Sequence, residues 1–234
     1  MKINKAEEAI KNLIDVFFYA GKLSLELRTK GLIEHIKNDK TPVTNGDIEV
    51  NNIILNNLKK ITPHVPIVSE ETAENKNLNL ETFWLVDPID GTYDYINNGD
   101  EFTLNAGLII NKEAVAGIIY APAKNRMFYS YGNKLSYELK NGKEEIINNK
   151  KIDKNNIKAV SYSNNLKAEI IEIHKKLNVK EYVKMKSSLK FCVVATGEYQ
   201  IYVAEPRAHE WDIAAGHAIL KNSSGVVTDF DGNN

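Results

Sequence analysis

The sequence predicts a mixed fold, α+β in its first part and α/β in its second. A 3.6-residue apolar repeat runs through the first thirty residues, and two short apolar runs further on each end in carboxylates. From residue 159 onward, segments of strand type and helix type alternate. With 234 residues, 43% of them hydrophobic, the chain can bury one sizeable core. We expect an N-terminal α+β lobe over residues 1–140 and a C-terminal α/β lobe over 141–234, joined as one unit.

The first predicted elements are two amphipathic helices. Apolar residues recur at helical spacing over residues 5–28 and again over 48–61. Asp47 stands directly before the second repeat, so we expect it to cap that helix. The polar segment 35–45 between the two helices is predicted to be a loop.

Strands dominate the middle of the chain. The apolar runs 65–68 and 83–86 predict two buried strands whose carboxyl ends carry charged residues. Further strands are predicted at 102–110, 114–120 and 127–131, followed by a hairpin over 135–147 that turns at Asn141-Gly142. The second half is predicted to contain strands at 159–163, 182–185, 201–204 and 226–230, and helices at 167–177, 189–195 and 211–220.

Charge and cysteine content narrow the class of function. Lys and Arg total 30 against 31 Asp and Glu, so the basic excess typical of nucleic-acid or anionic-membrane binding is missing. Cys192 is the single cysteine, which excludes an internal disulfide and favours a reducing compartment. The N-terminal residues do not resemble a signal peptide, and no apolar stretch is long enough to span a bilayer. We expect a cytoplasmic protein without a nucleic-acid partner, and its oligomeric state stays open.

The segment over residues 84–92 is the most informative in the chain. Its apolar residues predict a buried strand that ends at Asp87, after which a proline and Gly91 force a tight turn and Thr92 starts a short helix. Asp87 and Asp90, three residues apart on this turn, can converge on one point and offer the oxygens that Mg²⁺ prefers. The amides of Gly91 and Thr92 would face a phosphate at the start of the helix.

Two other acidic segments are expected to reach the same place. Glu70 follows the strand 65–68, and parallel neighbouring strands bring their carboxyl ends together. Asp212 opens a helix rich in Ala and Gly, which can approach another backbone closely. Each of these residues, taken singly, has a simpler explanation. Asp87 and Asp90 fit an ordinary turn, Glu70-Glu71 fits a solvated loop, and Asp212 fits a helix cap. Asp87, however, follows Phe-Trp-Leu-Val and lies beside a core, where a carboxylate requires a metal or another cation.

Together these motifs resemble a known family. The clearest match is Asp87-Pro88-Ile89-Asp90-Gly91-Thr92, with Glu70-Glu71 before it and Trp211-Asp212-x-Ala214-Ala215-Gly216 after it, which is similar to the inositol monophosphatase superfamily. Three further stretches resemble its 3'(2'),5'-bisphosphate nucleotidase (CysQ-type) branch: Thr41-Pro42-Val43-Thr44 with Asp47, Ser187-Ser188-Leu189-Lys190-Phe191-Cys192, and Gly216-His217-Ala218-Ile219-Leu220. The resemblance implies a layered αβαβα sugar-phosphatase fold forming one catalytic unit. It also implies hydrolysis of adenosine 3',5'-bisphosphate to AMP and phosphate, dependent on Mg²⁺ and inhibited by Li⁺.

The resemblance also implies roles for single residues. Glu70, Asp87 and the Ile89 carbonyl would hold one Mg²⁺, and Asp87, Asp90 and Asp212 a second, with two or three ions per site. Thr92, hydrogen-bonded to Asp47, would orient the attacking water, and Glu70 is the third residue implied in catalysis. Substrate contacts would come from the amides of Gly91 and Thr92, and from Glu70, Ile89, Asp90, Asp212, Ser187 and Lys190.

The family pattern usually continues past Asp231-Gly232 with a further strand, whereas this sequence ends at Asn234. We therefore expect either a short member of the family or a truncated chain.

Alternatives stay open at three points. One is inositol-1-phosphatase activity at the same metal site, and another is a protein-binding regulator that keeps the fold. Every implied ligand position is filled, which disfavours the regulator. Near the predicted helix 189–195, Ser187 and Ser188 could simply cap the helix and Lys190 could be solvated. Covalent catalysis has less support, because the serines lack a nucleophile-elbow glycine pattern and Cys192 fits a core position.

Overall fold

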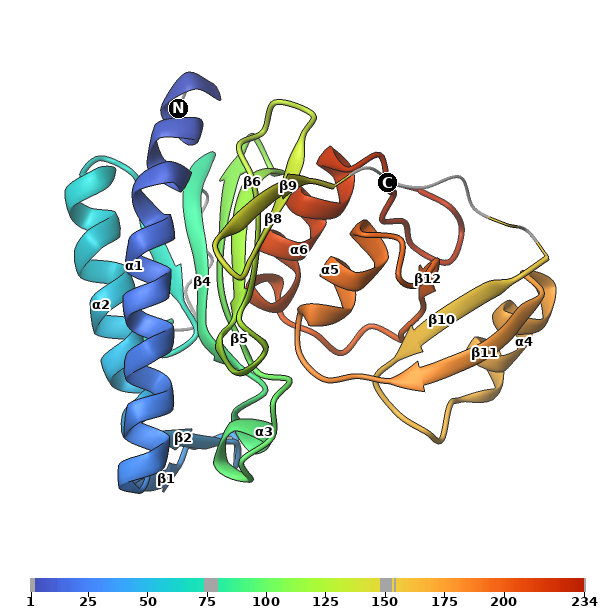
Figure 1. Ribbon diagram of the computed structural model, residues 1–234, viewed down its shortest axis with the longest axis horizontal. Coiled ribbons are helices and arrows are strands. Elements are labelled where there is room, and N and C mark those ends of the chain that lie inside the picture. Colours follow the sequence, from blue (N-terminus) through green and yellow to red (C-terminus); the bar gives the residue numbers. More distant parts are fainter. Residues whose placement is uncertain (1–2, 74–79, 148–152, 154, 234) are drawn as a thin grey trace.

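Helical and sheet layers alternate across the molecule, as Figure 1 shows. The computed structural model describes residues 3–73, 80–147, 153 and 155–233. A helix pair covers a large sheet, a second helix pair lies behind that sheet, and a small sheet and one more helix follow. This order confirms the predicted αβαβα layering. None of the described helices is both long enough and apolar enough to cross a membrane.

The large sheet has the strand order β3-β4-β5-β6-β7-β8-β9. Its first pair, β3 and β4, is parallel, and every following pair is antiparallel. The strands are β3 Ile67–Ser69, β4 Thr82–Asp90, β5 Thr103–Ile110, β6 Glu113–Ala121, β7 Arg126–Ser130, β8 Ser136–Lys140 and β9 Lys143–Ile146. Two short helices interrupt the series, α3 Thr92–Ile96 after β4 and the 3-10 turn Pro122–Lys124 after β6. The predicted hairpin at Asn141-Gly142 is present as β8 and β9.

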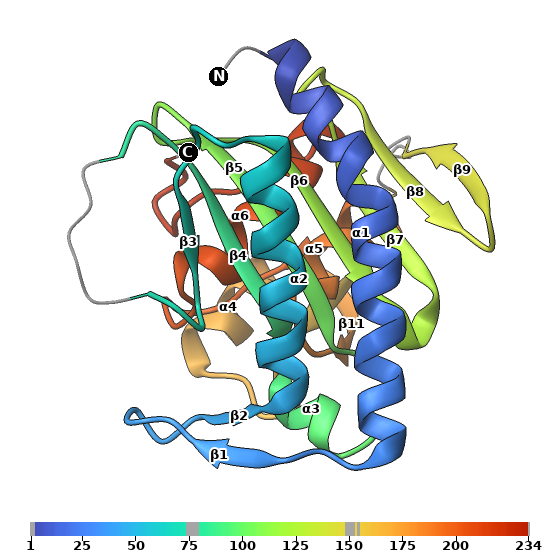
Figure 2. The same ribbon diagram turned by 90° about the vertical axis from the view of Figure 1, so that its left-hand side faces the viewer.

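Helices α1 Ile3–Lys30 and α2 Asn45–Ile61 cover one face of this sheet (Figure 2). Their apolar stripes meet alternate residues of the strands in one core, where Phe17, Ile54 and Trp84 are fully buried. Burying one large apolar side chain contributes roughly 1.5–3 kcal/mol. The Trp84 indole N–H is also satisfied, because it donates to Thr62 Oγ1 at 3.0 Å. Trp84 and its alternate neighbours therefore anchor β4, the strand that carries Asp87.

Helix α6, Glu210–Asn222, packs on the opposite face of the sheet. The contact requires glycine, since a Cβ on Gly107 would lie 2.7 Å from the Ala214 Cβ and one on Gly117 would lie 2.8 Å from the Ala215 Cα. The predicted close approach of this small-residue helix is thereby confirmed. Helix α5, Leu189–Ala195, packs beside α6 and shares a buried core with it.

The small sheet is parallel, in the order β11-β10-β12. Its strands are β10 Ile157–Ser161, β11 Val179–Lys184 and β12 Ile201–Tyr202, and α4 Ala168–Lys176 contacts β11.

Three local predictions are wrong. The segment 35–45 is not simply a loop, because it contains the paired strands β1 Glu34–Ile36 and β2 Pro42–Thr44. Asp47 does not cap α2. Thr44 is the N-cap, and Asp47 is the third residue of the helix, from where its carboxylate accepts the Thr44 N–H at 2.8 Å. The predicted strand 226–230 has no regular structure and pairs with none of the three described sheets.

Candidate metal centre

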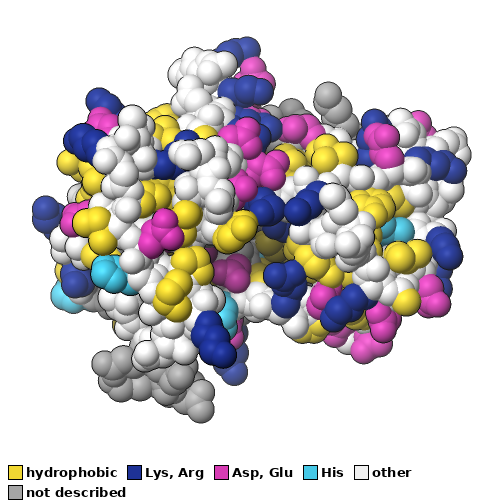
Figure 3. All heavy atoms as spheres, turned by 90° about the horizontal axis from the view of Figure 1, so that it is seen from below, with side chains coloured by type: hydrophobic (Ala, Val, Ile, Leu, Met, Phe, Trp, Pro, Cys, Tyr) yellow, Lys and Arg dark blue, Asp and Glu magenta, His cyan; other side chains and the backbone are white. Residues whose placement is uncertain are grey.

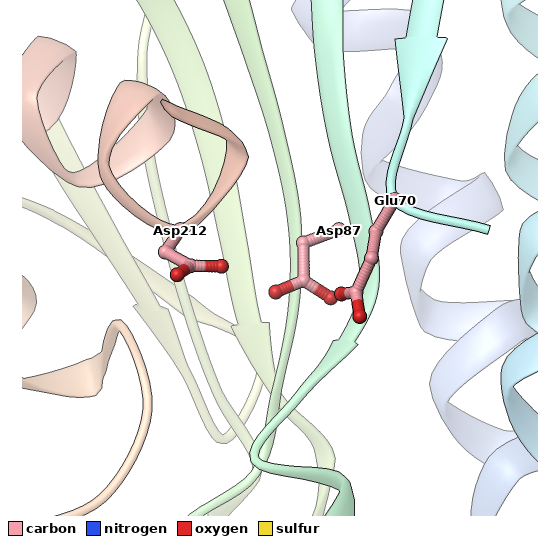
Figure 4. A group of neighbouring side chains, drawn as sticks. All are labelled: Glu70, Asp87 and Asp212. Carbon is pink, nitrogen blue, oxygen red and sulfur yellow. The ribbon is translucent and has the colours of Figure 1, made fainter. Parts of the chain in front are cut away.

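Three carboxylates converge at the carboxyl end of β4. Glu70, Asp87 and Asp212 each offer one oxygen, and these oxygens all lie within 4.8 Å of one another. Figure 4 shows the three side chains pointing toward one another from the end of β3, from β4 and from the start of α6. Glu70 is held in register because its N–H donates to the Val86 carbonyl at 3.0 Å.

Backbone geometry explains why Asp87 faces α6. Side chains alternate along a strand, so Asp87 lies on the same face as Leu85, whereas Trp84 and Val86 enter the core under α1 and α2. Leu85 contacts the Ala214 and Ala218 side of α6. Asp87 is therefore delivered, almost fully buried, beneath the first turn of that helix.

The cluster concentrates carboxylates where burial and mutual proximity make their ionisation costly. Burial raises the pKa of Asp87 well above its usual range, and the charges of Asp90, Glu70 and Asp212 act in the same direction. Burial, followed by the charge of Asp90, raises the pKa of Asp212 to about 6. Among the described residues, Asp87 Oδ1 is buried without a hydrogen-bond partner. An orphaned carboxylate oxygen facing two further carboxylates fits a hard divalent cation, which takes oxygen ligands.

The turn after β4 places the other implied ligands nearby. Asp90 lies outside the group of three described carboxylates, and its Oδ2 accepts two hydrogen bonds from Ser188. Gly91 has φ of 90°, a backbone region that favours glycine, and it precedes α3, which starts at Thr92 as predicted. The Ile89 carbonyl accepts from the Thr92 hydroxyl at 3.1 Å.

Thr92 also links this turn to the helix pair on the other face of the sheet. Its Oγ1 lies 3.2 Å from Asp47 Oδ1, so the expected hydrogen bond between Thr92 and Asp47 is present. The hydroxyl has one proton and two acceptors, Asp47 and the Ile89 carbonyl, and can serve one at a time. Asp47 is held from behind by Thr44, whose hydroxyl donates to Asp47 Oδ2 at 2.6 Å.

Lys190 is not solvated, contrary to the simpler alternative. Lys190 is only 7% exposed. Its ammonium donates to the Ser187 carbonyl and lies 5.4 Å from the centre of the Tyr202 ring. Burial lowers the pKa of Lys190, and the negative charge of Asp90 opposes this shift. Ser188 occupies the N-cap position of α5, but its side chain makes no capping hydrogen bond.

A cavity of about 1450 Å³ opens beside the acidic cluster. Its lining includes Asp90, Asp212, Ser187, Lys190, Tyr202 and Arg207. Figure 3 shows Lys and Arg side chains gathered around a hollow in the middle of one face of the molecule. The cavity thus joins an acidic end, suited to cations, to a basic wall, suited to anions.

Several residues of this region were not predicted from the sequence. Lys37 donates to Glu70 and to Glu71 at 2.8 Å each, and although burial opposes its charge these bonds raise the pKa of Lys37 to about 12. Arg207 stacks on Tyr162, with 4.6 Å between guanidinium carbon and ring centre. Asn105 lies directly across from Asp87 in the β4–β5 register, with a buried Oδ1 that has no partner among the described residues. Only Asn105 leaves a sequence signal, a polar residue inside an apolar strand.

The chain is similar in sequence and in fold to proteins of one known family. The model of the inositol monophosphatase family matches residues 4–234. The 3'(2'),5'-bisphosphate nucleotidase CysQ of Buchnera aphidicola is 37% identical over 201 residues, 85% of this chain and 75% of that protein. The protein of the same name from Escherichia coli K12 is 35% identical over 84% of this chain and 79% of its own length. Among solved structures, CysQ from Bacteroides thetaiotaomicron superposes with a TM-score of 0.77 and 28% identity, covering 92% of this chain and 86% of that one. The Thermotoga maritima IMPase gives a TM-score of 0.79 and 26% identity, covering 96% and 86%.

Proposed function

The chain belongs to the inositol monophosphatase family, and on that basis we propose that it is a Mg²⁺-dependent 3'(2'),5'-bisphosphate nucleotidase. The reaction is hydrolysis of adenosine 3',5'-bisphosphate to AMP and phosphate. The observation that carries this proposal is the cavity lined both by Asp212, one of the three converging carboxylates, and by the buried cation Lys190. The single buried thiol, Cys192, fits a reducing cytoplasm.

The acidic cluster is assigned to metal binding. Glu70, Asp87 and the Ile89 carbonyl would hold one Mg²⁺, and Asp87, Asp90 and Asp212 a second. Bound Mg²⁺ supplies a Lewis acid that activates water and neutralises charge on the leaving oxygen. In this assignment the chain needs no nucleophilic side chain of its own.

The residues around the turn are assigned to water and phosphate. When the Thr92 hydroxyl donates its hydrogen bond to Asp47 and not to the Ile89 carbonyl, the Thr92 oxygen would be free to accept a hydrogen bond from the attacking water. Proton transfer from that water would pass toward the Asp47–Thr92 pair or Glu70. The Gly91 and Thr92 amides, at the end of β4, would hold the reacting phosphate.

Specificity is assigned to the basic wall of the cavity. A bisphosphate carries a second, non-reacting phosphate, which an inositol monophosphate lacks. Burial lowers the pKa of Lys190, and the positive charge of Arg207 lowers it further. Lys190 and Arg207 both line the cavity, so its wall carries two cations that can face an anion. An ammonium that is already desolvated loses little further hydration when it meets a phosphate, which makes the contact favourable.

A phosphate-release panel tests the proposal. Adenosine 3',5'-bisphosphate, inositol 1-phosphate and fructose 1,6-bisphosphate are compared by kcat/KM while Mg²⁺ is titrated, with EDTA and Li⁺ as separate arms. We expect adenosine 3',5'-bisphosphate to have the highest kcat/KM, AMP to be its product, and both EDTA and Li⁺ to abolish turnover. A preference for inositol 1-phosphate would overturn the nucleotidase assignment, and full turnover in EDTA would overturn the metal assignment.

A further inference from the structure

Ser188 donates hydrogen bonds to one acidic residue of the site and lies beside a second. Its N–H and its hydroxyl both donate to Asp90 Oδ2, at 2.5 and 2.6 Å. The same hydroxyl oxygen lies 3.0 Å from the main-chain carbonyl of Asp212. Ser188 is 2% exposed, so these contacts are sheltered from water. Asp90 and Ser188 are 98 positions apart in the chain, and this is a tertiary contact between the β4 turn and the start of α5.

The hydroxyl of Ser188 is not explained by helix capping. Serine at an N-cap position stabilises a helix by accepting a backbone N–H from the first turn. Ser188 is at that position in α5, but its side chain makes no such hydrogen bond. The neighbouring Ser187 oxygen accepts the Leu189 N–H instead, at 3.4 Å. The Ser188 hydroxyl is therefore directed away from its own helix and toward the acidic site.

Two donors on one oxygen restrict how Asp90 can turn. The terminal torsion of an aspartate is broad, so a carboxylate held by nothing else rotates easily. Asp90 is buried and meets the charge of Glu70, and the charge of Asp90 in turn raises the cost of ionising Asp212. With Oδ2 fixed by charge-assisted hydrogen bonds, Oδ1 is left for another partner in a defined direction.

We propose that Ser188 is a positioning residue for the acidic site: its N–H and its hydroxyl orient Asp90 so that Asp90 and Asp212 face one cation. The inference rests on the metal-binding part of the proposed function. Residues that orient the ligands of a metal typically change its affinity 10- to 100-fold when they are removed. Ser188 is not assigned any contact with substrate.

The test compares Ser188→Ala with Ser136→Ala. Ser136 is a suitable control because it is also buried and its hydroxyl donates to a main-chain carbonyl of α6, that of Ile219, at 2.7 Å, and, among the described residues, to no carboxylate of the site. Ile219 lies near the other end of the helix, away from the carboxylates. Binding of Mn²⁺ to each purified protein is measured by electron paramagnetic resonance without substrate, and thermal unfolding in EDTA is recorded for both variants.

We expect Ser188→Ala to weaken Mn²⁺ binding about 10-fold or more, and Ser136→Ala to change it less than about 2-fold. If Ser188→Ala does not fold, Ser188→Cys keeps an unbranched side chain of the same length in atoms with a much weaker donor and should show the same loss. Wild-type Mn²⁺ affinity in the Ser188 variants, or an equal loss in Ser136→Ala, would overturn the proposal. The nucleotidase assignment is tested separately, by the substrate panel on the wild-type protein. If that assignment fails, the difference in Mn²⁺ binding between the Ser188 and Ser136 variants should still be observed.

Discussion

Replacing Asp212 with Asn is expected to stabilise the metal-free protein while it weakens metal binding. Burial and the charge of Asp90 raise the pKa of Asp212 from an ordinary value of 3.8 to about 6. Because the folded-state pKa exceeds the unfolded one, the folded state binds more protons between these values, and stability falls as pH rises through this window. Above pH 6 the ionised carboxylate opposes folding in full. At 1.36 kcal/mol per pKa unit this amounts to about 3 kcal/mol, which solvent screening of the half-buried side chain reduces to about 2 kcal/mol.

Asparagine keeps the shape of the side chain, and its carbonyl oxygen can still accept the His209 N–H, which Asp212 Oδ2 accepts at 2.9 Å. The helix start should therefore survive the change. For a chain of this size, 1 kcal/mol shifts the melting temperature by about 2–4 °C, so Asp212→Asn should melt about 4–8 °C higher at pH 8 in EDTA.

Differential scanning calorimetry with and without Mg²⁺ measures both effects. Mg²⁺ at about 100 times its dissociation constant raises the free energy of unfolding of a protein that binds it by about 2.7 kcal/mol. We expect this increase for the wild-type protein and a much smaller one for Asp212→Asn. Asp15→Asn is the matched control, because Asp15 is exposed on α1 and its replacement removes the same charge. Lower stability of Asp212→Asn in EDTA, or an undiminished gain from Mg²⁺, would refute the reasoning.

The other predictions concern pH, water and substrate. Burial and the charges of neighbouring carboxylates raise the pKa values of both Asp87 and Asp212, so the wild-type melting temperature in EDTA should rise as pH is lowered from 8 toward 5.5. Bound Mg²⁺ should flatten this pH profile, and a profile that Mg²⁺ leaves unchanged would contradict the prediction. Thr92→Val removes the hydroxyl at nearly constant volume and should lower kcat about 100-fold with little change in KM, whereas an unchanged kcat would mean that Thr92 only starts α3. Lys190→Ala should lower kcat/KM for adenosine 3',5'-bisphosphate about 100-fold and that for inositol 1-phosphate only slightly. Equal losses on both substrates would mean that Lys190 supports the fold.

Elements with an unbroken apolar period were predictable from sequence. The helix over residues 5–28 and the strands β5 and β6 lie where their patterns indicate, because each buries its apolar face against the shared core. Strand β4 lies at the predicted place but continues past its predicted end at Asp87 to Asp90. The strand predicted at 226–230 failed because apolar composition does not by itself provide a pairing partner, and Val226 is 75% exposed. The start of α2 was misplaced although Thr44-x-x-Asp47 is a capping-box pattern, which the sequence did contain.

The carboxylates of the site were predictable because each belongs to a short motif. Their partners were not, since those contacts join distant parts of the chain. Lys37 reaches Glu70 across 33 positions, and Ser188 reaches Asp90 across 98. A lysine in a polar hairpin and a serine before a helix have common local explanations, and only the tertiary structure shows which acidic group each one meets.

Packing on one face of the large sheet sets the geometry of the acidic cluster on the same face. Asp212 can approach Asp87 only because α6 lies against β5 and β6 without intervening side chains, at Gly107 and Gly117. Asp87 in turn is fixed by a strand whose alternate residues are buried under α1 and α2. The two helix layers therefore position the two carboxylates independently, with the sheet between them as the common reference. The repulsion between these carboxylates is balanced by core burial at both layers, which explains how the protein keeps a costly concentration of charge in place before any cation binds.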